Sequence, residues 1–116
     1  MTATIRMLHN PRCATSRKGL EYLRAKNIDF EVINYLSTGL TRDIVKEILL
    51  KSNLNPIELI RTQEEYYKKF LKAKNFNEEE WTEILIQNPK LLKRPIVIGK
   101  YKAAIGIPVE NIDKVL

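Results

Sequence analysis

The sequence predicts an α/β fold built on a mixed sheet, with the element order β-α-β, a helical insertion, and β-β-α. Three observations lead to this prediction. Short apolar runs with strand character lie near both ends of the chain, the middle third has helical periodicity instead, and turn residues separate the segments. A β-α-β unit implies a parallel strand pair, and a tight turn between two strands implies an antiparallel pair. We therefore expect a sheet with both kinds of pairing and helices on both faces.

The first β-α-β unit occupies the N-terminal third. Residues 4–9 are short and partly alternating, which predicts a strand, and Asn10-Pro11 is a turn signal. Residues 14–26 predict a helix, with an apolar face opposite a charged one. Residues 29–35 alternate again and predict a second strand, which we expect to be buried on both faces.

The middle of the chain is predicted to be helical. Thr41 is a good N-cap for a helix that ends at 53–55, and Pro56 suits the start of a short helix that continues to Arg61. Glu64 to Lys74 predicts another helix, and Asn77 caps a further one that ends at Asn88. These segments form an insertion between the two halves of the sheet.

The C-terminal third is predicted to complete the sheet. Residues 96–99 predict a strand, and Gly99-Lys100 predicts a tight turn into a hairpin partner over 101–105. Residues 108–116 predict a closing helix. The complete order is that of a thioredoxin-like mixed sheet.

Length and composition agree with one domain. A chain of 116 residues suits a single domain over 1–116, with the insertion at about 41–90. No apolar run approaches the roughly 20 residues needed to cross a bilayer, and the N-terminus has no apolar segment typical of a secretory signal. We expect a cytoplasmic protein without membrane association.

The net charge of +6 does not by itself define a partner. A basic surface attracts nucleic acids, anionic membranes or small anions, but it is also found on proteins with none of these ligands. The Lys and Arg residues are spread along the chain, and no nucleic-acid-binding motif is present. We expect no nucleic-acid partner.

The chain has one cysteine, Cys13, so no disulfide forms within it. Cys13 lies just after a predicted strand and at the start of a predicted helix. The unpaired N–H groups at a helix N-terminus stabilise a thiolate and lower its pKa. Arg12 and Arg17 add positive charge nearby. A lone cysteine is more often an inert core residue, but this placement favours a reactive thiolate.

Further residues around Cys13 are candidates for stabilising the thiolate. His9, the only histidine, ends the strand that leads to the cysteine, and it can donate a hydrogen bond directly or through Asn10. Ser16 offers a hydroxyl within one helical turn, and Arg17 offers a charge. Taken singly, each residue has a structural explanation, as a strand end, a first-turn helix residue or a solvated side chain. Together they support a reactive site.

Residues 9–17, HNPRCATSR, resemble the H-N-P-x-C-x-x-S-R motif of the glutaredoxin-coupled arsenate reductase family. The similarity extends over nearly the whole chain. It includes Asn34-Tyr35-Leu36, Leu59-Ile60-Arg61, Gln87-Asn88-Pro89 and residues 92–97, LKRPIV.

The resemblance implies a mechanism and a set of site residues. Cys13 attacks arsenate, Arg61 and Arg94 bind the oxyanion, and glutathione and glutaredoxin supply the thiols that this chain lacks. No cofactor is bound, and glutathione acts as a co-substrate. Thioredoxin-like folds also place a cis-proline before the third strand, facing the thiol, and Pro95 matches it.

One position departs from the family pattern. The reductases have a third oxyanion-binding arginine before the proline near the C-terminal helix, and this chain has Ile107 there. Lys93 and Lys102 are nearby cations, but neither occupies the motif position.

Two alternatives to arsenate reduction therefore stay open. One is a glutathione-dependent reductase of another small substrate, since such relatives also lack the third arginine. The other is a non-catalytic regulator of the Spx type that binds RNA polymerase. Spx proteins typically carry a C-x-x-C pair, whereas this chain has Ser16 in the second place.

Overall fold

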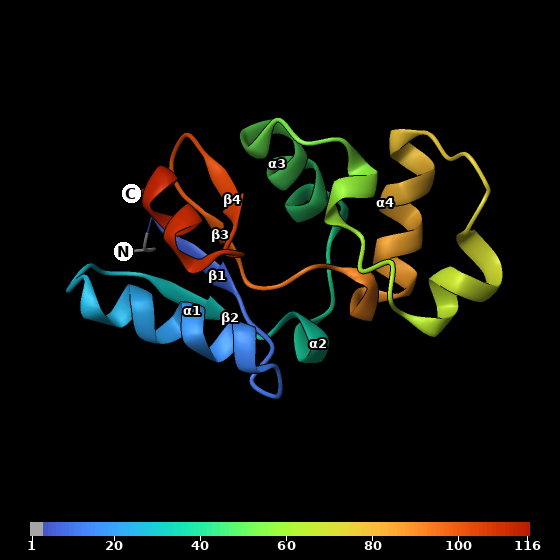
Figure 1. The fold of residues 1–116 in the computed structure, drawn as a ribbon. Helices are drawn as coiled ribbons and strands as arrows, with labels where there is room; N and C mark the ends of the chain where they lie inside the picture. The colour runs from blue at the N-terminus through green and yellow to red at the C-terminus, as the bar shows by residue number, and fades with distance from the viewer. Residues whose placement is uncertain (1–3) are drawn as a thin grey trace.

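A computed structural model describes residues 4–116. The outer elements are three-residue strands and two helices, and the middle of the chain is helical (Figure 1). Their bounds are β1 Arg6–Leu8, α1 Ala14–Ala25, β2 Glu31–Ile33, β3 Ile96–Ile98, β4 Ala103–Ile105 and the 3₁₀ helix η4 Val109–Lys114. This is the predicted element order.

The four strands form one sheet in the order β2-β1-β3-β4. β1 is parallel to β2, with Met7 opposite Val32, and antiparallel to β3, with Met7 opposite Val97. β3 and β4 form the antiparallel hairpin, with Val97 opposite Ala104. The predicted thioredoxin-like mixed sheet is confirmed, because the crossover through α1 gives the parallel pair and the short turn gives the antiparallel one.

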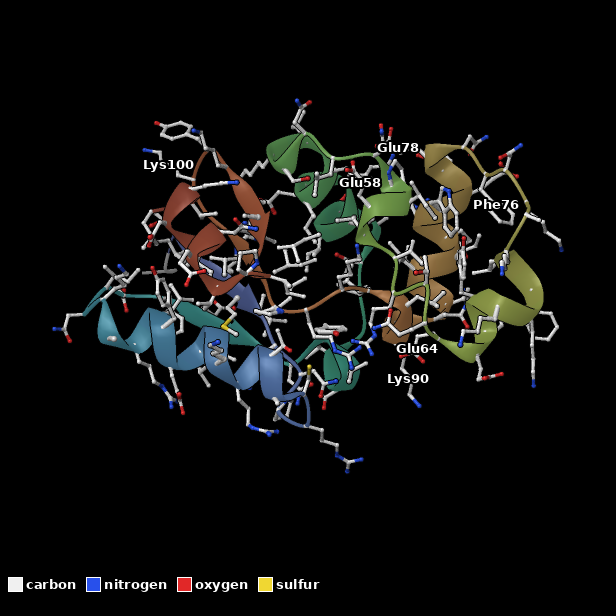
Figure 2. The ribbon with its side chains drawn as sticks, in the orientation of Figure 1. Glu58, Glu64, Phe76, Glu78, Lys90 and Lys100 are labelled. Carbon is white, nitrogen blue, oxygen red and sulfur yellow. The ribbon has the colours of Figure 1, made fainter. Side chains whose placement is uncertain are left out.

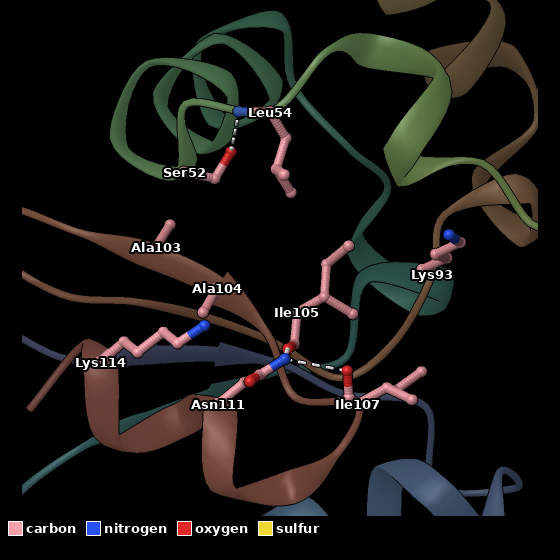
Figure 3. Close-up of a pocket in the computed structure, with 9 residues that line it drawn as sticks. All are labelled: Ser52, Leu54, Lys93, Ala103, Ala104, Ile105, Ile107, Asn111 and Lys114. Carbon is pink, nitrogen blue, oxygen red and sulfur yellow. Dashed lines mark hydrogen bonds between the residues drawn. The ribbon is translucent and has the colours of Figure 1, made fainter.

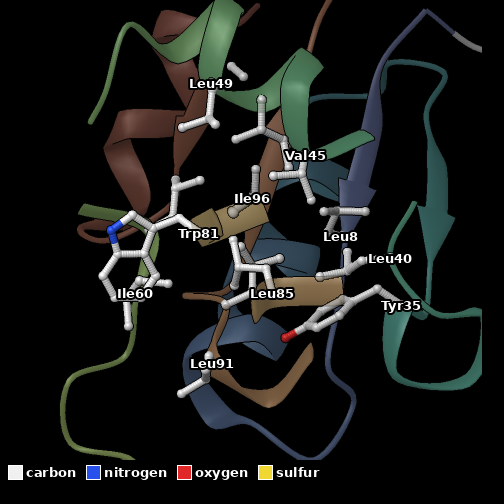
Figure 4. Close-up of a cluster of buried hydrophobic side chains, with 14 of the residues drawn as sticks. Leu8, Tyr35, Leu40, Val45, Leu49, Ile60, Trp81, Leu85, Leu91 and Ile96 are labelled. Carbon is white, nitrogen blue, oxygen red and sulfur yellow. The ribbon is translucent and has the colours of Figure 1, made fainter. Parts of the chain in front are cut away.

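Alternation along the strands divides the core into two parts. Successive side chains of a strand point to opposite faces of the sheet. Met7 and Val97 therefore pack with Leu23 of α1 and Ile112 of η4. On the other face, residues of β1 and β3 belong to a larger cluster with side chains of the insertion (Figure 4). That cluster includes Leu8, Ile96, Ile98, Tyr35, Leu40, Val45, Ile48, Trp81 and Leu85.

The insertion contains the helices α3 and α4, which lie to one side of the sheet in Figure 1. The side chain of Thr41 accepts a hydrogen bond from the Ile44 amide, and the side chain of Asn77 accepts one from the Glu80 amide, so both predicted N-caps are confirmed. The bounds are α2 Tyr35–Thr38, α3 Arg42–Ser52, η1 Pro56–Leu59, η2 Tyr67–Leu71, α4 Glu78–Gln87 and η3 Pro89–Leu91.

Three details differ from the prediction. The strand over 29–35 is not buried on both faces, because β2 is an edge strand and Glu31 and Val32 are exposed. The helix over 64–74 is shorter than expected and contains a π-helical turn, and its backbone becomes extended at Lys72. The closing helix is a 3₁₀ helix rather than an α-helix.

Pro95 lies between two glycines. The Arg94–Pro95 peptide bond is cis, as expected, and so is Ile107–Pro108. A Cβ atom added at Gly19 of α1 would lie 2.6 Å from Cγ of Pro95, and one added at Gly106 would lie 2.9 Å from the same atom. The absence of both side chains allows α1 and the end of β4 to approach the proline ring.

Helices long and apolar enough to span a bilayer are absent from the part of the chain that the structure describes.

Candidate active site

Cys13 is the N-cap residue of α1, at the point where the chain leaves β1 and enters the helix. Its backbone is extended, with φ −97° and ψ 122°. The Cys13 amide donates to the carbonyl of Asn10 at 3.0 Å, and the Arg17 amide donates to the carbonyl of Cys13 at 3.0 Å. The sulfur is free and partly exposed. The predicted position of the thiol at the start of the helix is confirmed.

The segment from His9 to Ser16, which we term the thiol loop, is fixed by its own hydrogen bonds. The Ser16 side chain is fully buried. Its hydroxyl oxygen lies 2.7 Å from Nδ1 of His9 and accepts from the Asn10 amide at 2.9 Å. The side-chain oxygen of Asn10 accepts from the Arg12 amide at 3.0 Å. The loop is therefore shaped before any ligand binds.

The surroundings of Cys13 favour its thiolate. Burial raises the pKa of the thiol, but the opposing influences are together larger. The Ser16 backbone amide, the Arg94 guanidinium and the Thr15 backbone amide each lower it, so the pKa of Cys13 lies below its ordinary value. The guanidinium that lowers this pKa belongs to Arg94, which lies far from Cys13 in the sequence.

The side chains of His9, Asn10 and Arg17 form hydrogen bonds with groups in or next to the thiol loop. The imidazole of His9 contacts Ser16, and the guanidinium of Arg17 donates to the carbonyl of Pro11 at 3.0 Å. Burial and the charges of Arg24 and Arg17 lower the pKa of His9, although a hydrogen bond with the Ser16 backbone opposes them. Near neutral pH the imidazole is therefore neutral.

The segments that carry Arg61 and Arg94 are paired by backbone contacts. Ile60 and Leu92 form an isolated antiparallel bridge. Beside it, the Arg61 amide donates to the carbonyl of Leu91 at 2.7 Å, and the Lys93 amide donates to the carbonyl of Leu59 at 2.8 Å. This pairing explains how two arginines far apart in sequence reach the same region.

Tyr35, Arg61 and Arg94 form a second side of the site, which we term the arginine wall. The Tyr35 side chain is fully buried at the start of α2. Burial raises the pKa of its hydroxyl, and the negative charge of Cys13 adds to this, whereas the charges of Arg94 and Arg61 and a close side-chain contact with Arg94 lower it. The pKa lies above its ordinary value, so the phenol keeps its proton. The phenol is thus within electrostatic reach of both guanidinium groups and of the sulfur.

The arginine wall contains buried polar atoms without partners. Within residues 4–116, no group forms a hydrogen bond of ordinary geometry with the Tyr35 hydroxyl or with Nε of Arg94. The same holds for Oδ1 of the neighbouring Asn34. Buried polar groups are paired in most proteins, and unpaired ones often mark a functional site.

The two arginines are only lightly held. Nε of Arg61 donates to a carboxylate oxygen of Glu64 at 3.1 Å. The guanidinium of Arg94 makes one long contact, at 3.4 Å, with the carbonyl of Lys90. Glu64 and Lys90 lie next to each other at the lower edge of α4 (Figure 2). The arrangement places Arg94 beside Cys13, whereas Arg61 is connected to the site through its proximity to Tyr35.

Ile107 is half exposed, with 48% of its surface accessible. It lines one hollow with Thr15 and Lys18 of α1, and a groove along β4 with Lys93 (Figure 3). Lys102 lies elsewhere, in a hollow at the turn of the β3–β4 hairpin. Of the two lysines considered from the sequence, only Lys93 lies near Ile107.

The sequence did not identify Tyr35 as a site residue. Tyr35 lies at the end of a predicted strand, and this position does not indicate that its hydroxyl lies near the charges of two arginines. Clusters of three or more His, Cys, Asp or Glu side chains that could hold a metal ion are absent from residues 4–116.

Comparison with known proteins gives concordant results. The ArsC family model matches residues 8–115. An arsenate reductase of Neisseria meningitidis serogroup B is 37% identical, over 97% of each chain, and the uncharacterized protein YfgD of Escherichia coli K12 is 35% identical over 100% of this chain and 99% of its own. The structure of an arsenate reductase from Vibrio cholerae superposes with a TM-score of 0.90, at 30% identity over 100% of both chains. This chain is a member of the ArsC family.

Proposed function

We propose that the protein is a thiol-dependent reductase of arsenate or a closely similar small oxyanion, with Cys13 as the nucleophile. The observation that carries this proposal is the Cys13 thiol at the N-cap of α1, whose pKa is lowered partly by Arg94. A thiolate next to a forked cation is suited to attack an electrophile that carries oxyanion oxygens. The arsenate reductases among its relatives support arsenate as the substrate.

The proposed reaction uses one thiolate of this chain and two external thiols. The Cys13 thiolate attacks arsenic(V), an S–As bond forms, and one oxygen leaves as water after protonation. A glutathione thiolate then attacks the Cys13 sulfur. An S–S bond forms, the S–As bond breaks, and its electron pair stays on arsenic, which leaves as arsenic(III). A glutaredoxin thiolate attacks the glutathione sulfur of this mixed disulfide and releases Cys13.

The remaining site residues support these steps. Arg94 and Arg61 bind the oxyanion, and the helix N-terminus with Ser16 keeps the sulfur ionised. His9, Asn10 and Arg17 hold the thiol loop in shape. Because the chain has a single cysteine, the resolving thiol comes from outside it; we propose glutathione and glutaredoxin for this role, with no bound cofactor, in a reducing cytoplasm.

A coupled assay tests the proposal. Arsenate is added to the protein with glutathione, glutaredoxin and glutathione reductase, and NADPH oxidation is followed. We expect arsenate-dependent oxidation by the wild type and none by Cys13→Ser. Equal rates for the two proteins would exclude Cys13 as the nucleophile.

Ile107 favours a second candidate, a glutathione-dependent reductase of a different and larger substrate. A half-exposed apolar side chain opposite the first turns of α1 is suited to contact an organic group. This candidate predicts weak arsenate activity together with turnover of a glutathione mixed disulfide, which the same coupled assay measures when that disulfide replaces arsenate.

A further inference from the structure

The Tyr35 hydroxyl is a buried polar group near the thiol that the sequence did not predict. Its side chain is fully buried among apolar residues of the larger core cluster. In Figure 4 the Tyr35 ring lies below Leu40, with the hydroxyl oxygen at the end of the side chain. Within residues 4–116 this oxygen has no hydrogen-bond partner of ordinary geometry, although the Arg94 guanidinium lies close enough to lower its pKa. A buried hydroxyl without a partner loses its hydration without compensation, typically about 1–3 kcal/mol, so packing alone would favour phenylalanine here.

The surroundings of the hydroxyl indicate the kind of partner that it lacks. The guanidinium groups of Arg94 and Arg61 are close enough to influence its ionisation, and so is the sulfur of Cys13. Three hydrogen-bond donors thus gather on one side of a thiolate. Donors near positive charge are complementary to an acceptor-rich anion, and tetrahedral oxyanions offer several acceptor oxygens.

We propose that the Tyr35 hydroxyl donates a hydrogen bond to an oxygen of the bound oxyanion, next to the guanidinium groups of Arg94 and Arg61. This inference rests on the proposed oxyanion-dependent activity of Cys13. It makes Tyr35 a residue that touches the substrate, and it supplies a donor in a chain that has isoleucine at position 107.

The hydroxyl becomes accessible when the guanidinium groups turn toward the anion. Among residues 4–116, the guanidinium of Arg94 makes a long contact of 3.4 Å with the carbonyl of Lys90, and that of Arg61 pairs with the partly exposed Glu64. Rotation of long side chains is fast compared with turnover. The proposal requires that, when the guanidinium groups of Arg94 and Arg61 turn onto the anion, the Tyr35 hydroxyl pairs with a remaining oxygen. Because its pKa is raised, it does so as a donor.

The test uses Tyr35→Phe, with Tyr22→Phe as a matched control. Tyr22 lies on α1, and its hydroxyl donates to the carboxylate of Asp113 at 2.8 Å on the exposed surface. Binding of arsenate, phosphate and sulfate is measured by calorimetry with the reduced protein, without glutathione. Unfolding by urea is measured separately in the absence of these anions.

The two variants should show opposite patterns. Tyr35→Phe should weaken binding of the tightest of the three anions by about tenfold to hundredfold, the range for a hydrogen bond to a charged group. Its urea midpoint should be unchanged or higher, because the lost hydroxyl has no partner in the free protein. Tyr22→Phe should leave anion binding unchanged and lower the urea midpoint slightly.

Two results would overturn the proposal. One is equal binding by wild type and Tyr35→Phe, including no measurable binding by either. The other is a clear fall in the urea midpoint of Tyr35→Phe, which would mean that the hydroxyl is already paired within the free protein. The calorimetry measures anion binding and does not depend on turnover. A protein that binds anions through Tyr35 but gives no arsenate-dependent NADPH oxidation would therefore refute the proposed function and leave this inference standing.

Discussion

The thiol loop and the arginine wall face the same sulfur but differ in how their polar groups are paired. In the thiol loop, the hydroxyl of Ser16 bonds to both His9 and Asn10. In the arginine wall, the hydroxyl of Tyr35 and Nε of Arg94 are buried without partners within the described residues 4–116. A paired network holds its shape without a ligand, whereas unpaired donors gain most when one binds. We therefore expect substitutions in the loop to affect folding first and substitutions in the wall to affect binding first.

The largest expected effect is on stability, for Ser16→Ala. This change leaves the Asn10 amide and Nδ1 of His9 without their shared partner in a buried site. Each unpaired buried group costs about 1–3 kcal/mol, so we expect a loss of about 2–4 kcal/mol in the free energy of unfolding. Urea denaturation measures it. The exposed Ser37→Ala is the control and should stay within about 0.5 kcal/mol of the wild type. A small effect at Ser16 would mean that the loop is held by something else.

The next effect is on anion binding, for Arg94→Gln. Loss of the guanidinium should weaken oxyanion affinity by about tenfold to hundredfold. It should also raise the pKa of Cys13, seen as a higher midpoint when iodoacetamide reactivity is titrated against pH. The wild-type midpoint should lie below that of a free cysteine, and the free energy of unfolding of the variant should change little.

Arg17→Gln is the matched control for Arg94→Gln, because it removes a guanidinium that contacts the thiol loop only at the carbonyl of Pro11 within residues 4–116. It should leave both anion affinity and the alkylation midpoint nearly unchanged. If the two variants behaved alike, general positive charge rather than the position of Arg94 would explain the thiolate.

Ile107→Arg tests whether the arginine wall is complete. A guanidinium opposite Thr15 should add one charge-assisted contact to an oxyanion and raise kcat/KM for arsenate by about tenfold. This gain in kcat/KM is at the lower end of the range for charge-assisted contacts, because position 107 is half exposed and solvent screens the added charge. If the natural substrate is larger and organic, the same change should lower activity on a glutathione mixed disulfide without creating arsenate activity. Efficient arsenate turnover by the wild type, unchanged in Ile107→Arg, would show that position 107 does not contribute.

The smallest effect is a pH dependence of stability that belongs to His9. Its pKa is depressed in the folded protein, so the unfolded chain takes up a proton more readily near the ordinary pKa of about 6.5. The resulting stabilisation is present above that pH and is lost as pH falls toward the folded pKa, by at most about 1.4 kcal/mol per pH unit.

His9→Asn isolates this contribution, because an amide can still contact Ser16 but does not titrate. The free energy of unfolding should fall less between pH 7.5 and 5.5 in the variant than in the wild type, with both pH values taken about one unit on either side of the ordinary pKa. Parallel curves for the two proteins would assign the pH dependence to other groups.

The sequence predicted the thiol loop far better than the arginine wall. The loop is local: a strand that ends at Leu8, a turn and a helix that begins at Ala14 fix Cys13 at the helix N-terminus. The hydrogen bonds inside the loop were less predictable. The sequence suggested that His9 donates to the sulfur, whereas in the structure its imidazole contacts the hydroxyl of Ser16. The wall depends on the contact of Ile60 with Leu92, which no local pattern specifies. Arg61 and Arg94 were identified only by resemblance, and Tyr35 was missed.

The expected burial of the strand over 29–35 on both faces was wrong for a similar reason. Alternation in residues 29–35 predicted a strand, and Glu31–Ile33 is one. Whether that strand is central or at an edge depends on the order of strands, which is decided by the whole chain. Its exposure at the edge of the sheet therefore could not be obtained from its own residues.

The contact of Pro95 with two glycines has a consequence for how the protein tolerates change. Gly19 belongs to the helix that presents the thiol, Gly106 follows β4, and Pro95 adjoins the arginine beside the sulfur. The proline ring separates α1 from the end of β4, and neither Gly19 nor Gly106 has room for a methyl group beside it. An alanine at either glycine has to displace the ring or its own element, and so changes the separation of nucleophile and cation. These positions far apart in the sequence should thus vary together, with a smaller side chain at position 95 compensating for a larger one at position 19 or 106.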